Sequence, residues 1–512
     1  MLSSWVVGVV FEVVITTDRT MMTNHHGKEF LGFIATGPAI GMPEWLWLAI
    51  CAPKPRVDKL GRPREAPYGL RKIEAALQNA GFNAAVVDPD HLDKHLDTVK
   101  AVLIGHHDFF AYGPPSSEWW SITGKEPVNR RSFIKLMESP FMRKAKEKGA
   151  KIIVGGPAAW QWLYELELME KWGVDTVVDG EGEKVVVNLV EKALNNEPLP
   201  RYVYVGVDNA PRVDEIPVIK GASVNGLVEI MRGCPRGCKF CSVTLRPLRF
   251  IPLEKILAEV EVNVKAGLRG VILHSEDVLL YHADGVKPKP EPILKLHKAV
   301  LEVIGEERHI AWSHASLAAI VYAEEKHKLV STLMNNYILN EHRKYLGVEV
   351  GIETGSPRLA REIMVAKSLP YPPEKWPDVV EEAFKIMHEN KIIPAATVIL
   401  GIPGETSEDV VKTIELIERL KPYRSIIVPM FFVPMGALKK NKWFLRDHVK
   451  PEHVEAILKM YEHTKYWALD IMKFYLSSPL HAPVRFLLRY FVWFVDHAVK
   501  KHRAVIEEMI KK

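Results

Sequence analysis

Two series of short apolar runs that alternate with amphipathic stretches constrain the fold of this 512-residue chain most strongly. Strands separated by helices pack as parallel sheets with helices on their faces. The first series occupies residues 44–195 and the second residues 226–440. The pattern therefore predicts an α/β protein with two parallel sheets.

The first series predicts a doubly wound, Rossmann-like domain over residues 44–195. Residues 1–43 are expected to form an amino-terminal extension, and the proline-punctuated residues 196–225 a linker. The expected strands are 45–52, 83–87, 99–104, 151–154 and 176–178, and the expected helices are 68–80, 133–148 and 184–194.

The second series has about six strand–helix units, which predict a partial (β/α)6 TIM-type barrel over residues 226–440. Residues 441–512 carry no strand signal and are expected to form a helical carboxy-terminal region. The expected barrel strands are 227–231, 270–274, 309–312, 346–352, 395–400 and 425–432.

Three of the four cysteines, Cys234, Cys238 and Cys241, lie within eight residues on a Gly- and Pro-rich segment after a predicted strand. So few cysteines cannot form a disulfide framework, and they indicate a reduced compartment and a metal or cluster site. Three thiolates are one short of a closed zinc site or a fully ligated cubane. Such a cubane keeps one iron open for an exogenous ligand. The alternative is a structural zinc knuckle completed by a distant histidine such as His274.

The segment from Met231 to Cys241 resembles the signature of the radical S-adenosylmethionine superfamily. This resemblance implies a [4Fe–4S] cluster on the three cysteines, with its open iron bound to S-adenosylmethionine. It further implies a reducing electron donor and a 5′-deoxyadenosyl radical that removes hydrogen from a substrate. No catalytic residue is assigned.

Later strand ends resemble the cofactor contacts of that superfamily. Polar groups after the second strand would meet the methionine amino group, and those after the fourth the ribose. The turn after the fifth strand and an aromatic residue beside the last cysteine would meet adenine. The expected contacts are, in that order, Ser275 and Glu276, Glu353 and Ser356, Gly401 and Pro403, and Phe240.

The first predicted sheet resembles a cobalamin-binding domain through two glycine-rich strand ends. Small residues there would let a large ring lie against the sheet edge. The glycines in question are Gly155, Gly156, Gly180 and Gly182. The pattern Asp-x-His-x-x-Gly, which supplies a cobalt-ligating histidine, is matched neither near His91 nor near His106. Cobalamin without a protein ligand, a domain that has lost cobalamin, and a plain Rossmann-like scaffold remain open.

The formal charge of +5 is small for 512 residues, and no basic stripe is evident, so no nucleic-acid partner is expected. No apolar segment of spanning length is found, which favours a cytoplasmic protein. Residues 461–499 are rich in aromatic side chains. They are expected to close the barrel, with peripheral membrane contact as the alternative.

The leading hypothesis is an enzyme that abstracts hydrogen from an unactivated carbon of a small-molecule or lipid substrate. The chain loosely resembles archaeal enzymes that remodel tetraether lipids, which suggests carbon–carbon bond formation on a lipid. The alternative is a cobalamin-dependent radical methyltransferase. A methylthiotransferase is disfavoured because no cysteines remain for a second cluster. The alternative of another class is a non-catalytic, metal-binding protein associated with nucleic acid.

Overall fold

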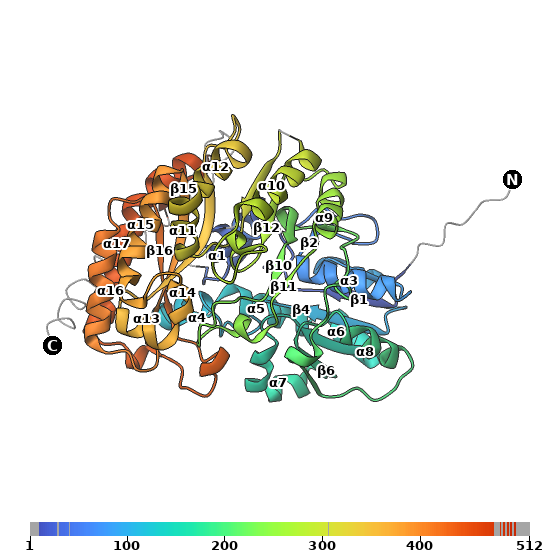
Figure 1. Cartoon of the computed structure of the whole chain (residues 1–512). Coiled ribbons are helices and arrows are strands. Elements are labelled where there is room, and N and C mark those ends of the chain that lie inside the picture. The colour runs from blue at the N-terminus through green and yellow to red at the C-terminus, as the bar shows by residue number, and fades with distance from the viewer. Residues whose placement is uncertain are drawn as a thin grey trace. The chain divides into compact units, whose positions relative to one another are not determined.

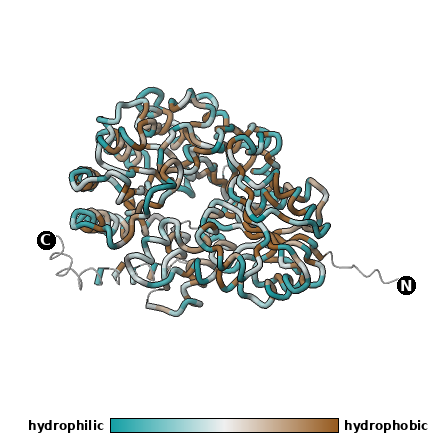
Figure 2. Tube along the Cα trace, turned by 90° about the horizontal axis from the view of Figure 1, so that it is seen from below, coloured by the Kyte–Doolittle hydropathy of each residue, from teal (hydrophilic) through white to brown (hydrophobic). Residues whose placement is uncertain are grey.

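The computed structural model describes residues 10–27, 30–39, 41–305, 307–475 and scattered positions between 482 and 497. Its contacts divide the chain into two units. The first comprises residues 1–228 and 258–268, and the second residues 229–257 and 269–512. Helix α9 (Leu253–Lys265) therefore has residues in both units. The hydropathy tube in Figure 2 shows hydrophobic stretches alternating with hydrophilic ones along both units.

The first unit is built on six parallel strands in the order β3-β1-β4-β5-β6-β7 (Figure 1). Chain order reverses between β1 and β4, so the carboxyl edge there is the switch point at which ligands bind in doubly wound sheets. The strands are β1 (Val13–Thr16), β3 (Ala84–Val86), β4 (Ala101–Gly105), β5 (Lys151–Gly155), β6 (Thr176–Gly180) and β7 (Tyr202–Val205).

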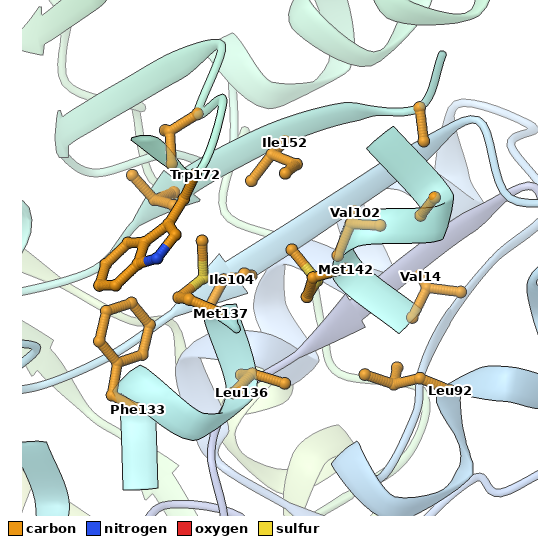
Figure 3. Packing of buried hydrophobic residues seen from close by; sticks show 14 of the residues in the cluster. Val14, Leu92, Val102, Ile104, Phe133, Leu136, Met137, Met142, Ile152 and Trp172 are labelled. Carbon is orange, nitrogen blue, oxygen red and sulfur yellow. The ribbon is translucent and has the colours of Figure 1, made fainter. Parts of the chain in front are cut away.

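Alternate residues of these strands enter two separate hydrophobic clusters, as expected for a sheet covered on both faces. Val14, Val102 and Ile152 belong to one cluster together with Phe133 and Met142 (Figure 3). That cluster packs beneath α5 (Val128–Met137) and α6 (Pro140–Glu147). The neighbouring strand residues belong to the other cluster, with α3 (Tyr68–Asn79) and α8 (Val185–Leu194). The sheet is thus doubly wound, as predicted.

The remaining elements of the first unit are short. They are α1 (Phe30–Ala35), α2 (Glu44–Cys51), β2 (Glu65–Ala66), α4 (Ser116–Thr123), α7 (Leu166–Lys171) and β8 (Ala222–Ser223), and β2 pairs with β8.

Residues 45–52 were predicted to form the first strand, and this prediction is wrong because they form helix α2. Trp47 and Cys51, four positions apart, are buried, whereas Trp45 is 70% exposed. That spacing is helical, and a short, wholly apolar run does not reveal it by periodicity.

Three further expectations need correction. The first strand, β1, lies within the expected extension, and β7 lies within the expected linker. The single helix predicted over 133–148 is two helices, because Ser139 caps α6 through the Met142 amide (3.3 Å) and Pro140 begins it.

The second unit contains five of the six predicted barrel strands and the end of the other, residues 227–229, which begins in the first unit. Two three-stranded sheets, β9-β12-β13 and β14-β15-β16, are joined by a backbone hydrogen bond from the Glu349 amide to the Ser313 carbonyl (3.0 Å). The barrel is not closed over the residues that the structure describes. The strands are β9 (Leu227–Glu229), β12 (Gly270–His274), β13 (His309–Trp312), β14 (Leu346–Glu353), β15 (Ile392–Leu400) and β16 (Ile426–Phe431).

Helices follow the barrel strands in this unit (Figure 1). They are α10 (Pro290–Ile304), α11 (Leu317–His327), α12 (Leu329–Leu333), α13 (Pro357–Ile363), α14 (Val365–Ser368), α15 (Trp376–Glu389), α16 (Ser407–Arg419) and α17 (Pro451–Tyr475). Helix α17 confirms the helical carboxy-terminal region. Most of the further helices expected after it lie outside the described residues. In the part of the chain that the structure describes, no helix combines the length and apolarity needed to span a membrane.

Candidate iron–sulfur and cofactor site

The three predicted cysteine ligands lie on one loop that a short antiparallel ribbon closes. Strand β10 (Met231–Arg232) precedes the loop and β11 (Arg249–Phe250) follows it, with Met231 opposite Phe250. Gly233 leads into the loop with φ +83°, and a Cβ atom there would lie 2.6 Å from the Pro247 carbonyl oxygen. Only glycine allows this close approach.

Backbone contacts from distant segments fix the middle of the loop. The Lys239 amide donates to the Ile363 carbonyl (2.9 Å), and the Ala437 amide donates to the Lys239 carbonyl (2.8 Å). A Cβ atom on Gly436 would lie 2.7 Å from the Cys241 carbonyl oxygen. The barrel therefore holds the loop from two sides.

Burial raises the pKa of the Cys234 thiol to about 12 and that of Cys241 to about 11. The Cys238 thiol lies close enough to both that its charge would raise their pKa further. Such thiols ionise when a metal centre replaces their protons.

The donor set fits a [4Fe–4S] cluster with one open iron. In the described residues, no three His, Cys, Asp or Glu side chains are already arranged around a common point for a metal ion. The fit therefore rests on three thiols in one loop and on the closeness of Cys238 to the other two.

A buried cation braces the cysteine loop. The guanidinium of Arg236 donates to the carbonyl oxygens of Ala366 (3.0 Å) and Lys367 (2.9 Å), and lies 3.5 Å from Asp277. Asp277 also accepts a hydrogen bond from Ser316. Burial raises the pKa of Asp277, and Arg236 opposes that shift. Arg236 thus links the cysteine loop to helix α14 and to Asp277, which follows strand β12.

A second buried pair joins Lys367 to Glu353, the last residue of β14. Glu353 also accepts a hydrogen bond from Thr397 of β15 (3.2 Å). Burial opposes the charge on Lys367, but Glu353 together with Cys238 and Cys241 outweighs it, so the pKa of the ammonium is raised. The Lys367 nitrogen lies 5.9 Å from the centre of the Phe240 ring. Two predicted cofactor residues, Glu353 and Phe240, are therefore brought together beside the cysteine loop.

The structure distinguishes Ser275 from Glu276. Ser275 is buried, and its hydroxyl accepts a hydrogen bond from the Asp277 amide (3.3 Å). Glu276 is half-buried and makes no side-chain hydrogen bond or ion pair with any described residue. Its charge raises the pKa of Cys241, so it lies near that thiol. Glu276 is the better placed of the two to meet a cationic amine.

Ser356, expected to contact ribose, has local partners. Its hydroxyl accepts from the Leu359 amide (3.3 Å) at the start of α13 and donates to Asp409 (2.5 Å). It is buried. These contacts account for the residue as a helix cap.

The Gly401–Pro403 turn, expected near adenine, is held by neighbouring side chains. Gly401 has φ +78°, and its amide donates to Glu405 (2.7 Å), which lies 2.9 Å from His453 of α17. A Cβ atom on Gly401 would lie 2.0 Å from the Phe444 ring. Glycine is therefore required for the ring to cover this turn.

Sequence reasoning named His274 only as a possible zinc ligand and did not bring it together with two polar neighbours. His274 ends β12, His314 follows β13 and Glu349 lies within β14. The His314 imidazole lies 3.0 Å from Glu349, and the His274 and His314 ring centres are 5.9 Å apart. Burial lowers the pKa of His274, and His314 lowers it further. We call His274, His314 and Glu349 the inner-face cluster. Buried residues alternate with half-buried ones along β14: Val348 and Val350 are buried, and Glu349 between them is half-buried. This alternation could have shown from the sequence that Glu349 lies on the other face of the strand.

The edge of the first sheet carries the predicted cobalamin-site glycines. Gly105, Gly155 and Gly180 end the adjacent strands β4, β5 and β6. A Cβ atom would lie 2.5 Å from the Val205 carbonyl oxygen at Gly180, and 2.9 Å from that of His106 at Gly156. Close strand packing therefore accounts for Gly156 and Gly180, and a flat ring at this edge stays a prediction. Gly182, whose Cβ would lie 3.4 Å from Ile73, lies close to α3.

His106 at the switch point is engaged by buried polar groups. Its Nε2 contacts the Asp18 carboxylate, and its Nδ1 accepts a hydrogen bond from the Asp108 amide (2.7 Å). His91 likewise lies 2.8 Å from Asp88. Both histidines considered for cobalt thus have carboxylate partners.

Comparisons with known proteins agree with this geometry. Residues 228–417 match the radical SAM superfamily. An uncharacterised protein of Methanopyrus kandleri is 27% identical over 37% of this chain and 34% of its own length. A tRNA-2-methylthio-N(6)-dimethylallyladenosine synthase of Orientia tsutsugamushi is 24% identical over 56% of this chain and 60% of its own length. The chain thus spans less than two thirds of these relatives.

A solved structure shares the fold across most of the chain. It is TsrM from Kitasatospora setae, a radical S-adenosylmethionine methyltransferase with cobalamin and a [4Fe–4S] cluster bound. Its identity is 14% and its TM-score 0.53, covering 84% of this chain and 77% of that one.

A parallel partial barrel with a three-thiol loop, preceded by a doubly wound sheet, defines an α/β enzyme of the cluster-dependent class. Residues 228–417 form a radical SAM domain. The superfamily uses a [4Fe–4S] cluster and S-adenosylmethionine, as predicted. The tRNA-modifying relatives give no support to the expectation that nucleic acid is absent among the partners.

Proposed function

We propose that this chain cleaves S-adenosylmethionine reductively and removes a hydrogen atom from an unactivated carbon of its substrate. The three-thiol loop, inside the residues that match the superfamily, carries this proposal. Cys234, Cys238 and Cys241 hold the [4Fe–4S] cluster. When bound, the cluster supplies the electron that breaks a sulfonium bond and yields a 5′-deoxyadenosyl radical.

Residues around the loop would position S-adenosylmethionine. Glu276 would accept hydrogen bonds from the methionine amino group, since a carboxylate pairs well with a cationic amine. Glu353, held by Lys367, would face the ribose hydroxyls, and Phe240 the adenine. Ser275, Ser356, Gly401 and Pro403 would act by shaping the backbone at those contacts.

The inner-face cluster would bind a polar group of the substrate. His274 has a buried Nδ1 atom with no hydrogen-bond partner in the described part of the chain. His314 and Glu349 form a pair that can donate or accept a proton. The charge of Glu276 raises the pKa of both His274 and Cys241, so Glu276 lies near both residues. This closeness supports a common space for substrate and cofactor.

Anaerobic reconstitution with iron and sulfide, followed by dithionite and S-adenosylmethionine, tests the proposal. We expect 5′-deoxyadenosine by mass spectrometry and a broad thiolate-to-iron absorption band. Well-reconstituted protein that forms no 5′-deoxyadenosine would contradict it. His314→Gln should retain cofactor cleavage but lose the stimulation that substrate causes, whereas an inner-face cluster without a substrate role would leave both rates unchanged.

For the reaction product, carbon–carbon bond formation on a lipid is the first candidate. Exposed aromatic side chains in the carboxy-terminal region support contact with lipid: Tyr466 (71%), Phe486 (71%) and Trp493 (58%). Incubation with deuterated glycerol dialkyl lipids should transfer deuterium into 5′-deoxyadenosine and give joined chains by mass spectrometry. Absence of deuterium transfer would contradict this candidate.

Cobalamin-dependent methylation is the second candidate, and the fold shared with TsrM favours it. The glycine-lined edge of the first sheet would hold cobalamin without a histidine from positions 91 or 106. Tight copurification of cobalamin, with transfer of a labelled methyl group from S-adenosylmethionine, would support this candidate. Protein that neither retains nor rebinds cobalamin would contradict it.

A further inference from the structure

The first unit contains a cavity of about 750 Å³ that shares no lining residue with the cysteine loop or with the glycine edge. Its walls are the turn 56–64, helix α3, the segment 220–222 and the last turns of α9, all within the first unit. The Arg64 amide donates to the Arg56 carbonyl (2.9 Å), which closes the turn. The volume lies within the range of small-molecule sites.

The side chains that line this cavity are predominantly basic. Six are basic and two acidic, which leaves a surplus of four positive charges in a chain whose formal net charge is +5. The basic residues are Arg56, Arg62, Arg64, Arg71, Lys220 and Lys265, and the acidic ones are Asp58 and Glu74. Positive charge is thus concentrated at one concave site, where the electrostatic potential is focused.

Both acidic groups are already paired within the wall. Arg62 contacts Asp58 at 2.6 Å, and Arg71 contacts Glu74 at 2.8 Å. Arg56 and Lys220, by contrast, make no hydrogen bond or ion pair through their side chains with the residues that the structure describes. Their charges are available to a ligand.

Two arginines in the wall have guanidinium groups that donate to backbone carbonyls. Arg71 is buried and donates to the carbonyl oxygens of Pro63 (2.7 Å) and Ala222 (3.0 Å). Arg64 donates through Nε (2.8 Å) and Nη2 (2.6 Å) to the Ala266 carbonyl. These bonds leave its Nη1 group for other partners.

Glycines let the backbone approach both guanidinium groups. A Cβ atom on Gly221 would lie 2.7 Å from the Arg71 guanidinium, and one on Gly267 would lie 2.9 Å from Arg64. Backbone and guanidinium groups therefore lie close together in the wall of the cavity.

From this geometry we propose that the cavity binds a small ligand that carries several linked phosphate groups. Because Lys265 also contacts Glu261 (3.0 Å), three surplus cations remain, and they call for a compact ligand with about three negative charges, which an oligophosphate supplies. Arginine guanidinium groups match the oxygen geometry of phosphate. Arg56 and Lys220 contact the phosphates directly, while Arg71 maintains the wall.

Inorganic tripolyphosphate is the probe, added to the full-length protein and measured by titration calorimetry and thermal shift. Sodium chloride at equal ionic strength controls for screening. We expect saturable binding that Arg56→Glu/Lys220→Glu weakens at least tenfold, while Lys125→Glu, an exposed lysine outside the cavity, leaves it unchanged. Unaltered circular dichroism and 5′-deoxyadenosine formation in the double variant show that it is folded.

Equal affinity in the double variant, or a thermal shift that chloride reproduces, would overturn the proposal. A labelled 20-nucleotide RNA and anionic phospholipid vesicles serve as competitors. RNA or vesicle binding that needs Arg56 and Lys220 but that tripolyphosphate cannot displace would also overturn it, since the phosphates would then belong to a macromolecular surface. Displacement by tripolyphosphate supports the cavity as the binding site.

Discussion

The carboxyl edges of the two parallel sheets are built in opposite ways. In the first unit, glycines end three adjacent strands and His106 is locked to Asp18. In the second, the corresponding ends carry titratable side chains such as Glu353 and His274 beside a three-thiol loop. The first edge presents backbone at its strand ends, whereas the second presents thiols and charged side chains. One topological rule, that ligands lie at strand carboxyl ends, therefore accommodates two different kinds of site.

The largest expected effect is the loss of the cluster when a cysteine of the loop in the second unit is replaced. Cys238→Ala should abolish cluster binding and reduce 5′-deoxyadenosine formation by at least about 100-fold, because a cubane ligand is lost. Iron content and product mass spectrometry measure both. Cys51→Ala, at a buried thiol of the first unit, is the matched control and should retain both. Equal loss of cluster and product in the two variants would mean that the cysteine loop is not the specific site of the cluster.

The buried Lys367–Glu353 pair tests whether charged side chains at the second edge stabilise the fold. Lys367→Met should lower the free energy of unfolding by about 4 kcal/mol, because it leaves a buried carboxylate unpaired. Urea unfolding followed by circular dichroism measures this. Glu353→Gln/Lys367→Met should recover much of the loss, and a double variant less stable than the single one would contradict the pairing argument.

Acid should destabilise the second unit through His297. Its Nδ1 lies 2.8 Å from the Ile293 carbonyl and its Nε2 accepts from Trp312 (2.8 Å), while burial lowers its pKa to about 4. The unfolded chain binds the proton with a pKa near 6.5, so stability is lost as pH falls from about 6.5 towards 4. The loss is about 3 kcal/mol at about 1.4 kcal/mol per pKa unit. His297→Gln should flatten this profile in unfolding experiments, and an unchanged slope would contradict it.

The smallest effect concerns the glycine edge of the first unit. Gly180→Ala should lower stability by about 2 kcal/mol, since φ is +121° and the new Cβ would meet the Val205 carbonyl at 2.5 Å. Gly124→Ala, at an open helix end with φ +65°, should lose only about 1 kcal/mol. Thermal unfolding measures both. Equal effects would mean that close strand approach at this edge is not what requires glycine.

The barrel strands were well determined by sequence because each is a clear apolar run bounded by turns. Strands β12 and β13 have the predicted bounds. In the first unit, the apolar run at 45–52 was misassigned and β1 was missed, since short apolar runs have no diagnostic period.

The sequence by itself determined the cofactor class, because three thiols at close spacing and in one loop carry their chemistry locally. Tertiary structure alone decided which polar groups share that space. Lys367 joins Glu353, and His314 joins Glu349, through contacts between separate elements. It also assembled the basic cavity from four segments spread between residues 56 and 266. Local chemistry depends on neighbours along the chain, whereas pairing and charge concentration depend on packing, which spacing along the chain does not encode.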